Sequence, residues 1–182
     1  MTEPLLNLVL YQPQIPNNTG NIGRTAATTG CRLHLIHPLG FSMDEKARRR
    51  AGLDYWHLVD CREHASWESF LNSESPRRMW LYTTGASRPH WEADFTRGDY
   101  LIFGQENGGL PSRVHRWVVE RFGDRHLINL PMRPVQGARS LNLATAVACA
   151  VYEGMRQLAA GGAPLWDADP GKLHGEVRGT PG

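Results

Sequence analysis

Short apolar runs alternate with helix-forming stretches along most of the chain. Runs rich in Leu, Val, Ile and aromatic residues predict strands that are buried on both faces, and they occupy residues 6–11, 32–36, 56–59, 79–83, 100–103 and 127–130. Capping signals and apolar positions at helical spacing predict helices over residues 21–29, 43–51, 66–71, 112–122 and 143–158. Strands that alternate with helices over short connections indicate an α/β fold, in which a mostly parallel six-stranded sheet is covered by helices on both faces.

Glycine, proline and capping residues set several of these boundaries. Gly30 and Gly52 are placed to end the first and second helices. Ser42, followed three residues later by Glu45, forms a capping-box pattern at the start of the second helix. Pro131 cannot donate a hydrogen bond to a sheet, so it ends the sixth strand.

The chain predicts one domain followed by a tail. Residues 1–160 are enough for a single stable core. Residues 161–182 are dense in Gly and Pro and low in apolar side chains, which predicts a disordered tail. The apolar run near the N-terminus is too short for a membrane span, and no basic region precedes it as in a signal peptide. We therefore expect a cytoplasmic protein that does not bind membranes.

Composition excludes some classes of function without selecting one. The formal net charge of +2 does not indicate a general binder of nucleic acid, so any RNA contact must come from local patches. The three cysteines are far apart and lack C-x-x-C spacing, which argues against a disulfide framework or a zinc site. The eight histidines show no regular ligand spacing, so no metal is expected.

Most of the clustered Gly, Pro and Asn residues fall in loops that follow predicted strands. These loops are residues 13–20, 84–87, 104–109 and 131–140. In parallel sheets, ligands bind beyond the carboxyl ends of the strands, where such loops meet. The functional interpretation depends on the convergence of these loops on one pocket.

The loop at residues 104–109, Gly-Gln-Glu-Asn-Gly-Gly, lies between a predicted strand and a predicted helix. Glycines in that position let the backbone approach a flat or phosphate-bearing ligand. The spacing is neither that of a dinucleotide-binding fingerprint nor that of a P-loop. Taken alone, such a loop is more often a plain turn, because glycine-rich turns between a strand and a helix are common.

Polar residues also gather at the entrance of the last helix, namely Gln136, Arg139, Ser140 and Asn142. The unpaired backbone N–H groups at a helix start favour a polar or anionic ligand. Ser140 alone would be interpreted as the helix cap. A helix that only packs in a core does not need the whole set.

Cations and aromatic residues offer further contacts. Arg24 is either a solvated surface residue or a partly buried guanidinium that binds phosphate or carboxylate. The four cations in residues 46–50 form either a solvated face or a contact for a phosphate backbone. Several side chains could stack on bases, although most aromatic residues belong to the core: Tyr55, Trp56, His57, His90 and Trp91.

Three segments taken together resemble the SPOUT RNA methyltransferases, which carry a C-terminal trefoil knot. The segments are NNTGNIGR at 17–24, FGQENGGLP at 103–111 and LPM…RSLNLATAVA…YE at 130–153. Each is weak alone, but their order and spacing make the resemblance specific, and it extends to about residue 158. Within the family the chain is most similar to small tRNA 2′-O-methyltransferases that act on the wobble nucleotide.

The resemblance implies a homodimer that binds S-adenosylmethionine and methylates the ribose of nucleotide 34, cytidine or a modified uridine, in the tRNA anticodon stem-loop. The residues that match the cofactor site are Tyr82, Thr83, Gly104, Glu106, Leu130, Met132, Ser140 and Leu141. Arg24 matches the family's proposed base, and the catalytic positions around it are Asn18, Glu106, Ser140 and Asn142. No metal is implied, because the sulfonium is itself the activated group. The segment 131–140 is about two residues longer than in the closest wobble enzymes.

Alternatives remain at this point. Arginine is almost always protonated, so Arg24 either becomes a base through its contacts or positions a phosphate. One rival function is 2′-O-methylation of another tRNA or rRNA nucleotide, although the expected absence of an extra N-terminal RNA-binding domain favours the anticodon. The other rival is an RNA-binding scaffold without activity, against which the intact Arg24, Glu106, Ser140 and Asn142 count.

Overall fold

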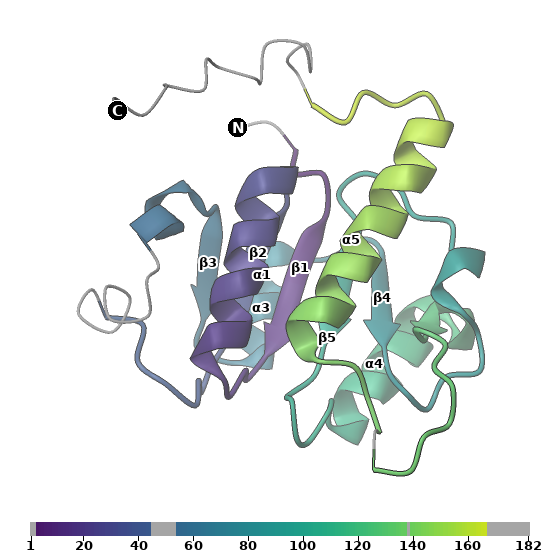
Figure 1. Ribbon diagram of the computed structural model, residues 1–182, viewed down its shortest axis with the longest axis horizontal. Helices are drawn as coiled ribbons and strands as arrows, with labels where there is room; N and C mark the ends of the chain where they lie inside the picture. Colours follow the sequence, from purple (N-terminus) through teal and green to yellow (C-terminus); the bar gives the residue numbers. More distant parts are fainter. Residues whose placement is uncertain (1–2, 45–53, 138, 167–182) are drawn as a thin grey trace, which may run out of the picture.

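The computed structural model describes residues 3–44, 54–137 and 139–166, and all structural statements refer to these residues. Six parallel strands form one sheet in the order β3-β2-β1-β5-β4-β6 (Figure 1). The strands are β1 (Asn7–Tyr11), β2 (Arg32–Ile36), β3 (Cys61–His64), β4 (Met79–Tyr82), β5 (Tyr100–Phe103) and β6 (Leu127–Ile128). The predicted α/β sheet is confirmed, while the trefoil knot stays a prediction.

Helices cover both faces of the sheet. They are α1 (Pro16–Thr29), α3 (Trp67–Glu74), α4 (Ser112–Phe122) and α5 (Leu143–Ala160), with short 3-10 helices η1 (Asp54–Leu58), η2 (His90–Glu92) and η3 (Asp124–His126). Leu8 packs in a cluster with Ile22 of α1 and Val147 of α5. The next residue, Val9, packs on the opposite face with Val118 of α4. Figure 1 shows α1 and α5 side by side on one face, and α3 and α4 behind the sheet.

The strand order creates a place for a ligand. From β1 the chain moves through β2 to β3 on one side, and the later strands β4, β5 and β6 lie on the other. The winding therefore changes direction between β1 and β5, and such a switch point leaves a crevice at the carboxyl ends of the strands. Because every strand is parallel to its neighbours, all these ends lie at one edge.

The first helix begins five residues earlier than predicted. It starts at Pro16 instead of Asn21, so much of the expected loop 13–20 is helical. Proline suits the first helical position because its φ is preset and its missing N–H needs no partner. The preceding Ile15 offers no side-chain cap, so Pro16 is the local signal of this helix start, and the prediction did not use it.

The predicted third strand at 56–59 is wrong. Residues Asp54–Leu58 form η1, and β3 follows at Cys61–His64. Trp56 is buried because it packs on α1, where a Cβ at Gly23 would lie 2.5 Å from the indole ring. The apolar run therefore reflects contact with a helix, while the true strand, CREH, is a polar strand at the sheet edge.

The other elements agree with the prediction to within a few residues, except that β6 is two residues shorter than expected. Most of the helix predicted over 43–51, and the basic run 46–50, lie outside the described residues. Met43 and Asp44 are described and are not helical. Among the described helices, none combines the length and apolar character that crossing a bilayer requires.

The chain beyond α5 folds back onto the core instead of ending at residue 160. Leu165 and Trp166 pack against the cluster beneath α1. The indole N–H of Trp166 donates to the carbonyl of Thr29 at 3.4 Å, and Arg97 donates to the carbonyl of Leu165 at 3.2 Å. Part of the predicted tail therefore packs against the domain, while the boundary at 160/161 stays a prediction. Residues 167–182 lie outside the described chain.

Two buried histidines link β1, β2, β3 and α3. Nδ1 of His34 lies 3.0 Å from Nε2 of His64. The remaining ring nitrogens contact the Asn7 side-chain oxygen at 3.1 Å and the Ser73 hydroxyl at 3.2 Å. All four nitrogens thus have partners while both rings are neutral. Burial lowers the pKa of His34 to about 3 and also lowers the pKa of His64.

Acid should unfold the protein through these histidines. Since the pKa of His34 is about 3 in the folded protein and roughly 6.5 when unfolded, the unfolded state binds more protons below about pH 6.5. Stability is then fully present above that pH and falls by up to about 1.4 kcal/mol per unit as the pH drops toward 3. Urea unfolding between pH 7 and pH 5 measures this slope.

The variant His34→Gln should have a shallower slope than the wild type, by up to about 1.4 kcal/mol per pH unit. His57→Gln, at an exposed histidine of η1, is the matched control and should keep the wild-type slope. Equal slopes in all three proteins would contradict this assignment.

Candidate functional site

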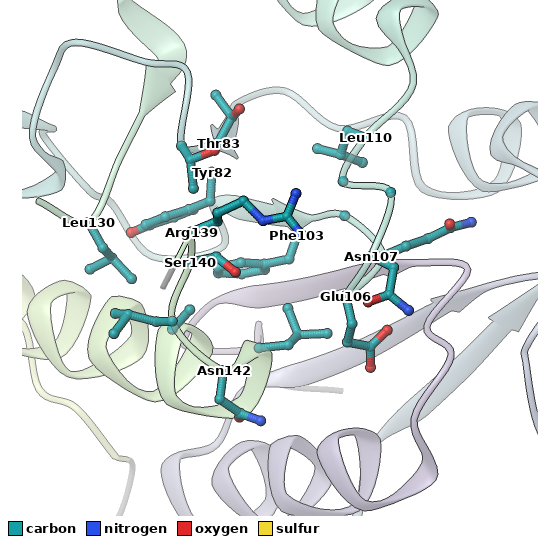
Figure 2. A pocket seen from close by; sticks show the side chains of 18 of the residues that line it. Tyr82, Thr83, Phe103, Glu106, Asn107, Leu110, Leu130, Arg139, Ser140 and Asn142 are labelled. Carbon is teal, nitrogen blue, oxygen red and sulfur yellow. The ribbon is translucent and has the colours of Figure 1, made fainter. Parts of the chain in front are cut away.

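A cavity of about 730 Å³ opens at the carboxyl ends of β4 and β5. Its volume lies within the roughly 300–1,000 Å³ typical of small-ligand sites. The loop after β4, the glycine-rich loop after β5 and the loop before α5 all contribute to its lining (Figure 2). Ile15 and Asn18 from the start of α1 complete one side. The predicted convergence of these segments on one pocket is confirmed.

All but one of the predicted site residues line this cavity. They are Asn18, Tyr82, Thr83, Gly104, Glu106, Leu130, Met132, Ser140, Leu141 and Asn142. The exception is Arg24, which is exposed on α1 with its guanidinium carbon 4.3 Å from the centroid of the Tyr55 ring. A single chain therefore does not bring Arg24 to the pocket.

The glycine-rich loop is a tight turn that only glycine permits. The backbones of Gln105 and Gly109 exchange two hydrogen bonds of 3.0 Å. A Cβ at Gly104 would lie 2.1 Å from the carbonyl carbon of Gly109, which is too close for any side chain. Gly109 has a φ of +63°, a conformation that glycine adopts without strain. The loop can therefore present bare backbone to the cavity.

Glu106 caps the start of α1 from a distant part of the chain. Its carboxylate accepts hydrogen bonds from the backbone N–H groups of Gln14 at 2.8 Å and Ile15 at 3.1 Å. It also accepts one from the side-chain amide of Asn18 at 3.0 Å. A negative charge at a helix N-terminus is stabilised by the unpaired N–H groups and the helix dipole. This carboxylate therefore anchors the two residues that lead into α1 and the side chain of the third helical residue, Asn18.

Asn142 connects this network to α5. Its side-chain oxygen accepts from the backbone N–H groups of Ala144 at 2.9 Å and Thr145 at 3.3 Å, so it is the N-cap of α5. The interpretation of Ser140 as the cap is thus wrong. The Asn142 amide also donates to the Asn18 side-chain oxygen at 2.9 Å. One chain of hydrogen bonds, through Glu106, Asn18 and Asn142, fixes the glycine-rich loop and both helix starts.

Aromatic rings form part of the wall of the cavity. Tyr82 and Phe103 stack with ring centroids 4.6 Å apart and an angle of 17° between the rings. Burial raises the pKa of Tyr82, so its hydroxyl stays neutral, and that hydroxyl has no hydrogen-bond partner among the described residues. The prediction missed Phe103 as a site residue, although its position directly before the glycine-rich loop is the signal that could have revealed it.

Charge within the cavity is concentrated on two side chains. Glu106 is occupied by three N–H donors, as described above. Arg139, in contrast, makes no hydrogen bond or ion pair with the described part of the chain, and it is exposed. His115, which the prediction also missed, lines the cavity with its Nδ1 3.3 Å from the Pro111 carbonyl oxygen.

The five residues that were predicted to stack on bases differ in how far they are buried. Trp56 and His90 are buried, so the prediction that these two side chains could stack on bases is wrong. Trp91 is 54% exposed, and His57 is also exposed. Tyr55 is half-buried beneath Arg24, and its hydroxyl donates to a backbone carbonyl of α1. None of these five residues lines the cavity.

One group of potential metal ligands exists among the described residues, and it lies outside the cavity. It consists of His34, His64 and Glu74, whose ligand atoms lie within 4.8 Å of one another. Both Glu74 carboxylate oxygens accept hydrogen bonds from Arg62, at 2.9 and 3.1 Å. The groups that the cavity offers to a ligand include backbone polar groups, side-chain amides and aromatic rings.

The winding of the parallel sheet changes direction beside this pocket, and a glycine-rich loop and two helix starts surround the pocket. These features define an α/β protein with a small-molecule site at its switch point. The chain belongs to the SpoU rRNA methylase family, whose model matches residues 5–152. The resemblance seen in the sequence is thereby confirmed.

Relatives match the chain over most of its length. The tRNA (cytidine(34)-2'-O)-methyltransferase of Escherichia coli strain K12 is 44% identical over 163 residues, which cover 90% of this chain and 100% of the relative. The protein of the same name from Saccharophagus degradans is 44% identical over 154 residues, 85% of this chain and 96% of the relative. A solved structure concerned with 2-OH methylation of C/U34 on tRNA has a TM-score of 0.73 and 47% identity, covering 86% of this chain and 98% of that one.

Replacing Glu106 by Gln should destabilise the fold. The new amide group would face one of three N–H donors, so at least one donor would lose its acceptor, at a cost of about 1–3 kcal/mol. Urea unfolding measures the loss. Glu120→Gln, at an exposed carboxylate of α4 without a hydrogen bond to described residues, is the control and should change stability by less than about 0.5 kcal/mol. Equal stabilities of the two variants would show that Glu106 is not a structural cap.

Proposed function

We propose that this protein transfers the methyl group of S-adenosylmethionine to the ribose 2′-hydroxyl of tRNA nucleotide 34, a cytidine or a modified uridine in the anticodon stem-loop. The observation that carries the proposal is the convergence of all three family segments on one cavity. The relatives named for cytidine 34 match at 44% identity over at least 85% of this chain. We therefore propose that this tRNA-modifying enzyme is cytoplasmic.

The residues of the cavity fit the proposed cofactor. The stacked Tyr82 and Phe103 provide an aromatic surface for a purine, and the buried Tyr82 hydroxyl lacks a partner that a ligand could supply. The backbone at Gly104 can approach closely because no side chain intervenes. When bound, S-adenosylmethionine supplies an activated methyl group. The chain's own residues then need to hold the ribose in line with it and accept or share the hydroxyl proton.

Arg24 remains our proposed group for that proton, and a homodimer is the proposed means of bringing it to the site. Large apolar side chains are exposed next to the cavity and along α5, namely Ile15 at 41%, Leu141 at 41% and Tyr152 at 61%. Exposed apolar surface of this kind marks an interface. A two-fold pair formed through α1 and α5 would place Arg24 of one copy near the cavity of the other.

Mapping of tRNA nucleosides by mass spectrometry tests the reaction. After incubation of tRNA with isotopically labelled S-adenosylmethionine, we expect the labelled methyl group on nucleotide 34. Label on another nucleotide would establish the rival methyltransferase, and a tRNA that is bound but unlabelled would establish the scaffold.

Substitution of Arg24 separates its role from that of the cavity. Arg24→Ala should abolish methyl transfer and leave the affinity for S-adenosylhomocysteine, measured by calorimetry, within about twofold, because Arg24 does not line its own cavity. Gly104→Ala should abolish cofactor binding, because the loop cannot form. Loss of cofactor affinity in Arg24→Ala would instead indicate a structural arginine.

Mixing these two inactive variants tests the homodimer. After equal amounts are unfolded and refolded together, about half of the dimers contain one copy of each, and each of these has one complete site. About a quarter of the wild-type activity should return. No recovery, with mixed dimers verified by mass spectrometry, would mean that Arg24 acts within its own chain.

A further inference from the structure

Arg139 is the uncompensated charge of the cavity. Glu106, the acidic residue among the described lining side chains, already accepts three hydrogen bonds. Arg139 has no partner in the described chain, and Figure 2 shows it among the side chains that line the cavity. An exposed guanidinium has five N–H donors in a planar fork that matches a phosphate or carboxylate. Its ligand is therefore an oxyanion that enters with the substrates.

Two oxyanions would reach this cavity under the proposed function, on which this inference rests. One is the carboxylate of the methionine part of the cofactor. The other is the phosphate on the 3′ side of the target ribose. The 2′ and 3′ oxygens of a ribose sit on neighbouring carbons, so a 2′-hydroxyl cannot approach the methyl group without bringing this phosphate to the cavity mouth.

The position of Arg139 favours the phosphate. The residue is exposed at the rim, in the loop that leads into α5, whereas the buried surface of the cavity is formed by Tyr82 and Phe103. A phosphodiester remains partly in solvent while its ribose enters, and an exposed arginine can meet it there. The cofactor also carries a positive sulfonium, which a nearby guanidinium would repel.

We propose that Arg139 binds the 3′ phosphate of the target nucleotide and thereby positions its ribose. The sequence left open whether Arg24 is a base or a phosphate-binding group. If Arg139 holds the phosphate from within the same chain as the cavity, Arg24 is free to act on the proton. Arg139 is thus a positioning residue.

The test uses anticodon stem-loop analogues with a 2′-deoxyribose at nucleotide 34, which bind but cannot be methylated. One analogue has a normal phosphodiester between nucleotides 34 and 35, and the other has an uncharged methylphosphonate there. In the presence of S-adenosylhomocysteine, the wild type should bind the uncharged analogue about tenfold more weakly, as expected for loss of one charge-assisted contact. Arg139→Gln should bind both analogues equally, and Arg139→Lys should retain part of the difference.

Arg133→Gln is the matched control, because Arg133 is an exposed arginine of the same loop that does not line the cavity. It should discriminate between the analogues as the wild type does. The affinity of Arg139→Gln for S-adenosylhomocysteine should stay within about twofold of wild type.

Two results would overturn the proposal. A tenfold difference that persists in Arg139→Gln would mean that another group binds the phosphate. A loss of S-adenosylhomocysteine affinity would assign Arg139 to the cofactor carboxylate. Failure of the wild type to methylate nucleotide 34 would refute the proposed function separately, since these binding measurements do not depend on turnover.

Discussion

The carboxylate of Glu106 is the interaction on which the site depends. It anchors the two residues that lead into α1, Gln14 and Ile15, and it fixes the glycine-rich loop in the same contact. Loop and helix therefore cannot move independently. All three of its hydrogen bonds are with the chain itself, so this carboxylate holds the site together. The structural use of Glu106 explains why the proposed chemistry relies on two arginines.

The sequence predicted those parts of the fold whose signals are local. Buried apolar runs identified five of the six strands, and glycine and proline marked the loops at their ends. The failures have non-local causes. The early start of α1 is an exception, because Pro16 is a local signal that the prediction did not use, while the contact of Glu106 with Gln14 and Ile15 spans about ninety positions. The apolar residue at position 56 reflects packing on Gly23 of α1 and not a strand. The polar sequence of β3 reflects its position at the sheet edge.

Ten of the eleven residues that the resemblance proposed for the site line one cavity, eight of them within the three family segments, while their roles stay predictions. Arg24 shows the limit of that reasoning. Two copies of a homodimer have the same sequence, so a motif can name a functional residue without telling which copy presents it. The exposed position of Arg24 beside Tyr55, away from the cavity lining, is the observation that motivates the proposed homodimer. Phe103 stands at the start of a family segment and could have been identified, whereas His115 belongs to no distinctive pattern and is brought to the pocket by the folded chain.

The hydrogen bond between Asn18 and Asn142 joins residues 124 positions apart. During synthesis on a ribosome, α1 and the glycine-rich loop emerge well before α5 does. The pocket can therefore close only when nearly the whole chain has been made. A chain that ends before α5 would lack the part of the cavity wall that Leu143 and Ala146 form.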